Sequence, residues 1–266
     1  MTERSAPFDT AQAASAAQFD RQSDRYGKSH ILADTSDLAE ALKKISLPPG
    51  AGGGRALDVA TGGGHTALYL ARKGWRVTAG DVSARMLENA AKLLNDEWLE
   101  LTTQVFPAEE IPFPEATFDL VTVRFAPHHF SSPEKFIAEV ARVLRPGGHF
   151  MLIDGTPPDH DPETEEWLHQ VEKWRDPSHG RFLSRTAWEA LVNARGLHIL
   201  SSTLHDKKQP DLEWYFETAA TIPENRAHVL EAVRTIPDSV RQALRLHEEE
   251  GTVVWWWPIL SLVAQK

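Results

Sequence analysis

The chain has 266 residues, of which 41% are hydrophobic and 25% are charged, and this is the composition of an ordinary globular protein. Its 38 acidic residues outnumber the 28 basic ones for a formal net charge of −10, which argues against nucleic acid or an anionic membrane surface as a partner. The absence of cysteine excludes disulfides, thiolate metal sites and a cysteine nucleophile, and it fits a reducing cytoplasm.

The first segment of the chain, residues 1–34, is polar and rich in alanine, and we expect a loose helix or arm ahead of the main domain, residues 35–266. This segment lacks the apolar run of a signal peptide, and no later stretch approaches the roughly 20 apolar residues of a membrane span. The sequence therefore predicts a cytoplasmic protein, as a monomer or a homodimer. The main domain opens with an amphipathic helix that Thr35 or Ser36 caps.

Strands and helices alternate from residue 55 to residue 154. Apolar runs predict the strands, and apolar residues at a spacing of about 3.6 predict the helices. The expected strands cover residues 55–60, 75–81, 99–106, 118–124 and 149–154, and the expected helices cover residues 63–73, the segment after Ser83, and residues 133–144. This alternation indicates an α/β domain in which helices cover both faces of a parallel sheet.

Two long segments, residues 155–184 and 205–250, interrupt the regular pattern. Between them we expect a helix over residues 185–195 and a strand over residues 197–204. Both segments leave the sheet after late strands, at the edge where open α/β sheets bind ligands, so we interpret them as lid insertions. The chain ends in a β-rich segment in which Trp255 and Trp257 share one face, either within the core or lining an apolar pocket.

The sequence DVATGGGHTALYL, from Asp58 to Leu70, places three glycines between the first strand and the first helix. Such a turn lets a ligand approach the backbone, and the start of the helix offers unpaired N–H groups. Asp81, which ends the second strand, is positioned to accept hydrogen bonds from two ribose hydroxyls. The glycines alone fit a plain turn equally well. Together with the flanking strand and helix and the acid on the next strand, they predict a nucleoside-binding site.

Four successive segments resemble the motifs of class I S-adenosylmethionine-dependent methyltransferases: LDVATGGGHTALYLA, VTAGDVSARMLENA, AEEIPFPEATFDLVTVRFAPHHF and EVARVLRPGG. The resemblance covers residues 26–154 and is closest to the small-molecule group that includes the ubiquinone/menaquinone-biosynthesis methyltransferases. It implies a Rossmann-like, doubly wound, mostly parallel sheet of seven strands with helical lid insertions. It also implies S-adenosyl-L-methionine as the cofactor and an N-terminal arm that closes over it.

The resemblance further implies which residues bind this cofactor. Asp58 supports the turn that holds the methionine part, and Asp81 binds the ribose. The other implied contacts are Tyr26 and His30 in the arm, Ala60, Thr61, Gly62 and Gly64 in the turn, Val82, Met86, Ala108 and Glu109 around the adenine, and Arg124 at the end of the fourth strand. Pro107 stands where relatives often have an aspartate that contacts the adenine amino group, and this departure affects that contact but not the pocket.

A nicotinamide dinucleotide is the rival cofactor for a turn of this kind. No segment beyond the turn clearly houses a second nucleotide half, and Asp58 suits a cationic methionine end better than a pyrophosphate. The resemblance therefore favours methyl transfer to the oxygen or carbon of a small molecule. Two alternatives remain: an enzyme that uses the same cofactor for a rearrangement or cyclisation, and a non-catalytic protein that only binds it.

A base is needed in methyl transfer only when the acceptor must lose a proton, whereas alignment of the reacting atoms is always needed. His128 and His129, in RFAPHHF after the fourth strand, are candidate catalytic residues that could deprotonate a phenol, an enol or a similar acid. Alternatively, one stacks on the cofactor and the other caps the next helix. The same segment lacks the Asn/Asp-Pro-Pro-aromatic motif typical of enzymes that methylate nucleic-acid amines, which favours a small-molecule acceptor.

The segment WRDPSHGRFLS concentrates polar residues within the first predicted lid. Arg175, His179 and Arg181 are candidate contacts to the acceptor, or members of an internal Arg–Asp network that fixes the lid. Glu166 and His169 have the spacing of only half a helical metal site, so we expect no metal.

Overall fold

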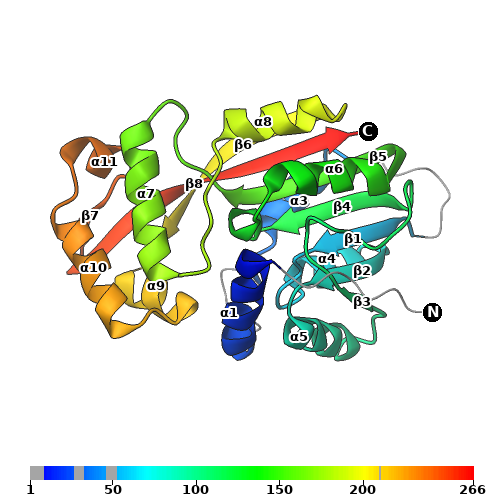
Figure 1. Cartoon of the computed structure of the whole chain (residues 1–266), viewed down its shortest axis with the longest axis horizontal. Coiled ribbons are helices and arrows are strands. Elements are labelled where there is room, and N and C mark those ends of the chain that lie inside the picture. The colour runs from blue at the N-terminus through cyan, green and yellow to red at the C-terminus, as the bar shows by residue number, and fades with distance from the viewer. Residues whose placement is uncertain (1–8, 27–32, 46–52, 210) are drawn as a thin grey trace.

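A mostly parallel sheet forms the centre of the protein, which the computed structural model describes over residues 9–26, 33–45, 53–209 and 211–266. The strand order is β3-β2-β1-β4-β5-β8-β6, and the short β7 pairs with β8 (Figure 1). β1 to β5 are parallel to one another, whereas β8 is antiparallel to both β5 and β6. The order reverses between β1 and β4, the place where doubly wound sheets bind ligands. The predicted Rossmann-like fold class is confirmed.

The strands follow the predicted apolar runs, with differences at their ends. They are β1 (Arg55–Val59), β2 (Arg76–Asp81), β3 (Thr102–Val105), β4 (Phe118–Arg124), β5 (Leu144–Gly155), β6 (His198–Gln209), β7 (His247–Glu249) and β8 (Thr252–Gln265). β5 begins earlier than predicted because Leu144 pairs with Phe118 ahead of a break in register. β6 continues beyond the prediction because the long β8 pairs with it as far as Gln209 and Trp255.

Helices cover both faces of this sheet, and each face buries its own apolar cluster. The helices on the sheet are α3 (Ser36–Leu42), α4 (His65–Arg72), α5 (Ala84–Asn95), α6 (Pro133–Val143) and α8 (Arg185–Ala194). α6 and α8 pack Phe136 and Trp188 against Phe150 on one face. α3 and α4 pack Leu38 and Leu70 on the other face. Burial of these periodic stripes fixes the helices on the sheet.

Serine side chains cap the N-termini of α5, α6 and α8. The Ser83 Oγ accepts a hydrogen bond from the Met86 N–H, which confirms the predicted cap of α5. The predicted cap of α3 is different. Thr35 occupies the cap position but makes no side-chain bond to the helix, and the Asp34 carboxylate instead accepts a hydrogen bond from the Ser36 N–H.

The two predicted insertions lie together and form one body, which we call the second lobe. It contains α7 (Pro162–Arg175), α9 (Leu212–Ala219), α10 (Pro223–Arg234), α11 (Asp238–Ala243), β7 and the outer ends of β6 and β8 (Figure 1). Its apolar centre joins Val171 of α7 to Tyr215 of α9 and Trp255 of β8. Trp256 lies on the opposite face of β8, where it stacks on His247.

Helix α1 (Thr10–Tyr26) lies where the main sheet domain meets the second lobe (Figure 1). On the sheet side its Asp20 accepts a hydrogen bond from the Ser83 hydroxyl. On the lobe side the Gln18 amide donates to the Ala219 carbonyl at 3.2 Å. Contacts in both directions place α1 across the carboxyl edge of the sheet.

Gly64 supplies a first test of this packing. Its φ is +87° and a methyl group there would lie 2.7 Å from the Ala90 Cβ, so Gly64→Ala combines backbone strain with overpacking. We expect it to lower the unfolding free energy by roughly 2–4 kcal/mol in urea denaturation. Gly74 is the matched control, because it has the same φ of +87° and no atom within 4 Å of an added methyl. Gly74→Ala should cost only about 1–2 kcal/mol, and equal losses would contradict the predicted contact with Ala90.

Candidate functional site

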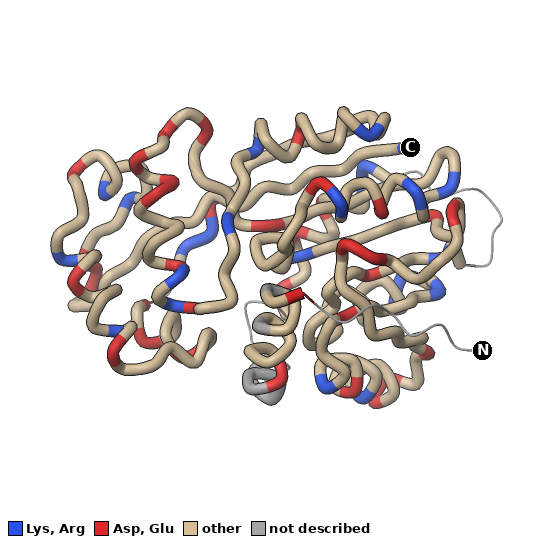
Figure 2. Tube along the Cα trace, viewed as in Figure 1, with Lys and Arg blue, Asp and Glu red and all other residues tan. Residues whose placement is uncertain are grey.

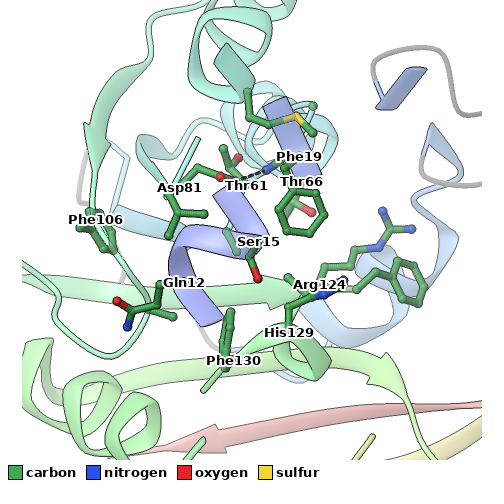
Figure 3. Close-up of a pocket in the computed structure, with 18 of the residues that line it drawn as sticks. Gln12, Ser15, Phe19, Thr61, Thr66, Asp81, Phe106, Arg124, His129 and Phe130 are labelled. Carbon is green, nitrogen blue, oxygen red and sulfur yellow. Dashed lines mark hydrogen bonds between the residues drawn. The ribbon is translucent and has the colours of Figure 1, made fainter. Parts of the chain in front are cut away.

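A pocket opens at the carboxyl ends of β1, β2 and β4 and has a volume of about 860 Å³ (Figure 3). Part of this volume is open to solvent. Its lining consists of Gln12, Ser15, Phe19, Ala60, Thr61, Gly62, Gly63, His65, Thr66, Asp81, Val82, Met86, Phe106, Ala108, Glu109, Arg124, Phe125, Ala126, His129 and Phe130. The predicted turn and second-strand acid therefore share one cavity with one of the two candidate histidines.

The turn after β1 forms the floor of the pocket. Ala60 and Gly62 both have φ near +52°, a left-handed conformation that is uncommon for a residue other than glycine and is often found at functional sites. An added Cβ at Gly62 would meet no atom within 4 Å, so this position opens into the cavity. Behind it, Gly64 occupies the N-cap of α4 without a side-chain cap bond, and the N-terminus of a helix favours a negatively charged or hydrogen-bond-accepting ligand group. Gly64 faces Ala90 and serves helix packing instead.

Asp58 fixes this turn from below and does not line the pocket. Its carboxylate accepts hydrogen bonds from the hydroxyls of Thr61 at 2.6 Å and Thr122 at 2.7 Å. Burial raises the pKa of Asp58 to about 6, against the effect of these two hydrogen bonds. The carboxylate thus joins β1, the turn and β4 while it keeps a negative charge close beneath the cavity floor.

Asp81 borders the pocket itself. One oxygen accepts a hydrogen bond from the Gly62 N–H and the other accepts one from the Ser83 N–H, both at 2.9 Å. An ionised carboxylate can accept about four hydrogen bonds, so each oxygen retains capacity for a ligand hydroxyl. Burial raises the pKa of Asp81 to about 6. Val82 and Met86 line the pocket beside it.

The loop after β3 closes the opposite wall with Phe106, Ala108 and Glu109. The Glu109 carboxylate accepts hydrogen bonds from the Ser131 N–H at 2.7 Å and from the Gln12 side chain at 3.0 Å. It therefore links the loop to the segment that follows β4 and to α1. Pro107 does not line the pocket, whereas its two neighbours in the sequence, Phe106 and Ala108, do.

Arg124 reaches the pocket from the end of β4, and its guanidinium is bound to the N-terminal part of the main domain. It donates to the Asp37 carboxylate at 2.9 Å and to the Asp34 carbonyl at 2.5 Å. Its side chain is almost fully buried. These bonds hold the segment before α3 against the site.

Helix α1 supplies three pocket residues that the sequence did not single out: Gln12, Ser15 and Phe19 (Figure 3). The Ser15 hydroxyl is buried and has no hydrogen-bond partner in the part of the chain that the structure describes. A buried hydroxyl of this kind is a candidate contact for a polar ligand. The only signal for these residues in the sequence was that they belong to a polar, alanine-rich segment. The side chain of Tyr26 and all of His30 lie outside the described residues.

The two candidate histidines lie in a short 3₁₀ turn, η1 (Pro127–His129), and have different surroundings. His129 lines the pocket, whereas His128 does not. The His129 Nδ1 is 3.1 Å from the Ser178 carbonyl oxygen, which can only accept, so this nitrogen carries the hydrogen and Nε2 carries the lone pair. The His128 Nδ1 is 2.7 Å from the Asp154 carboxylate at the end of β5.

The three predicted acceptor contacts lie behind these histidines or on the surface, outside the pocket lining. His179 is buried against His128, with ring centroids 5.3 Å apart, and its Nε2 has no partner among the described residues. Arg175 is bound by Glu172 and by the Tyr215 carbonyl. Arg181 is exposed and pairs with a glutamate of α7. Their role toward an acceptor stays a prediction.

The same region contains several histidines and carboxylates. Within the described residues no group of three or more His, Asp and Glu side chains is arranged to hold a metal ion. The geometry instead presents a pocket with a main-chain floor, to which Asp81 contributes a carboxylate and His129 contributes an imidazole.

Comparison with known proteins agrees with this geometry. A family model described as a methyltransferase domain matches residues 57–152. YcgJ of Bacillus subtilis, described as an uncharacterized methyltransferase, is 34% identical over 180 residues, which are 67% of this chain and 70% of the relative. The ubiquinone/menaquinone biosynthesis C-methyltransferase UbiE of Desulfotalea psychrophila is 39% identical over 40% of this chain and 44% of its own length.

Solved structures extend the agreement to the whole fold. A candidate methyltransferase from Bacillus halodurans has a TM-score of 0.80 at 28% identity, over 87% of this chain and 99% of that one. The crystal structure of YcgJ has a TM-score of 0.78 at 26% identity, over 86% of this chain and 97% of the other. The chain belongs to the S-adenosylmethionine-dependent methyltransferase family, and S-adenosyl-L-methionine is its cofactor.

Proposed function

We propose that this methyltransferase acts on a small-molecule acceptor, at oxygen or carbon, and that His129 is the base that takes the acceptor's proton. One observation carries the proposal: the same cavity has the glycine turn and Asp81 on one side and the imidazole of His129 on another. A donor held by the first group and an acceptor beside the second would meet within a single enclosed space.

The described residues fit the methyl donor. Asp81 has free acceptor capacity for two ribose hydroxyls, and Gly62 lets the ligand approach the main chain. The buried negative charge of Asp58 beneath the floor suits a cationic methionine end. The unpartnered Ser15 hydroxyl offers one more polar contact from α1. When bound, the donor supplies a methyl group already activated on a sulfonium, so the protein contributes alignment and, where needed, a base.

The surroundings of the pocket favour a small acceptor. Phe19 of α1 contacts His129 edge to face at 4.9 Å and covers the pocket from above the strand ends. Basic and acidic residues are interspersed along the described trace, which shows no long basic run of the kind that binds a phosphate backbone (Figure 2). No described helix is both long enough and apolar enough to cross a membrane.

His129 has the features of a base for an acidic O–H or C–H group. Its Nδ1–H bond to the Ser178 carbonyl fixes the tautomer, and no described residue makes a hydrogen bond to Nε2. With the donor held by the glycine turn and Asp81, the His129 Nε2 would take the proton of the acceptor atom as that atom bonds to the methyl group that the donor would supply.

The direct test of the proposal is incubation of the protein and isotopically labelled S-adenosylmethionine with a low-molecular-weight cell extract. We expect label in a small organic product, at an oxygen or carbon atom that mass spectrometry identifies. A second incubation uses the unfractionated extract. If the label then appears only in protein or nucleic acid, the acceptor is not a small molecule.

Asp81→Asn tests the ribose contact by calorimetric titration with S-adenosylhomocysteine. Loss of hydrogen bonds to a charged carboxylate predicts an affinity about 10- to 100-fold weaker. Because the pKa of Asp81 in the free protein is about 6, the wild-type affinity should be complete above pH 6 and should fall at lower pH. The variant lacks this part of the pH dependence. Asp96→Asn, an exposed change beside Lys92, is the control and should bind like the wild type.

His129→Gln tests the base. Its rate of label transfer to the product should fall by about 100- to 10,000-fold at unchanged affinity for the cofactor. His198→Gln, at the exposed start of the edge strand β6, is the matched control and should retain the wild-type rate. An unaltered rate in His129→Gln would remove the base from the mechanism while leaving the cofactor site intact.

A further inference from the structure

Asp154, which the sequence did not single out, makes a two-point contact with His128. One of its oxygens accepts the His128 main-chain N–H at 3.0 Å, and the other lies 2.7 Å from the ring Nδ1. Asp154 is only 1% exposed, at the end of β5. A buried carboxylate in this geometry both orients an imidazole and stabilises its protonated form.

His128 in turn contacts His129, with ring centroids 4.2 Å apart. Two imidazoles this close in a buried place cannot easily both carry a positive charge, so a proton on one disfavours a proton on the other. The other charged or titratable groups around the pair come from α7 and the loop after it: Glu172, Arg175, Asp176 and His179. Among the described carboxylates around the pair, Asp154 alone makes a hydrogen bond to one of the two rings.

We propose that Asp154 is a positioning residue that acts through His128: it retains a proton on His128 and thereby keeps His129 in the unprotonated form that can accept a proton from the acceptor. This inference rests on the proposed role of His129. The same repulsion between the rings returns the proton from His129 to solvent after transfer, which restores the base for the next cycle.

The electrostatics of the pair agree with this assignment. Burial opposes the charge on His128, but the ion pair and hydrogen bond with Asp154 outweigh it and raise the pKa of His128. Burial and then the charge of His128 lower the pKa of His129 to about 3. A lowered pKa keeps His129 unprotonated but also makes it a weaker base, so the acceptor group must be more acidic than an aliphatic alcohol.

The test is an NMR titration of the histidine side chains in the protein without donor or acceptor, with His129 assigned by its loss in His129→Gln. In Asp154→Asn the proton on His128 loses its partner. The midpoint of His129 should therefore rise by about one pH unit or more. His128→Asn removes the neighbouring charge directly and should move His129 in the same direction, so it carries the test if Asp154→Asn does not fold.

Glu249→Gln is the control, because it removes an exposed carboxylate beside a different histidine, His247, and should leave His129 unchanged. An unaltered His129 midpoint in both Asp154→Asn and His128→Asn would overturn the inference. That result would leave the proposed methyl transfer standing, since the titration uses neither substrate. Conversely, a shifted midpoint together with an unaffected His129→Gln rate would support the coupling and reject the base.

Discussion

The structure depends on a left-handed bend of the main chain, residues 60–64, that two buried carboxylates hold at the carboxyl edge of the sheet. Asp58 joins the bend to β4 through Thr61 and Thr122, and Asp81 joins it to β2 through the Gly62 N–H. Burial of two negative charges this close is costly, as the raised pKa of each shows. A ligand that carries a positive charge and donates hydroxyl hydrogen bonds offsets part of this cost, so ligand binding and stability are coupled in this protein.

The same edge of the sheet brings together groups that lie far apart in the sequence. β4 ends in Arg124 and leads into the histidine turn, and β5 ends in Asp154, its neighbour in the sheet. Parallel strands place all their carboxyl ends on one side, so the proposed base His129 and its proposed positioning residue lie next to the pocket without any special loop. Helix α1 then lines the pocket at this edge.

The division of the chain follows this plan. Residues 57–152, which match the methyltransferase family model, form the turn, the acid and the histidine segment. The second lobe lies mostly outside that range and packs its own aromatic cluster around Tyr215, Trp255 and Trp257. The scaffold is shared with the family, which explains why the cofactor follows from the fold. The acceptor depends instead on local side chains beside the reacting edge.

The sequence by itself determined the fold class and located the glycine turn and the acid that share the pocket, because these depend on patterns confined to short segments: apolar periodicity, three glycines, and a carboxylate at the end of the next strand. It could not assign Ser15 to the pocket or Asp154 to His128, since neither contact has a local signature. Only tertiary structure decided that His129 faces the cavity while His128 faces a carboxylate, and that two insertions separated by α8 and β6 form one lobe. Those outcomes depend on which strands are neighbours and on how distant apolar faces pack, and that information is not contained in any single stretch of residues.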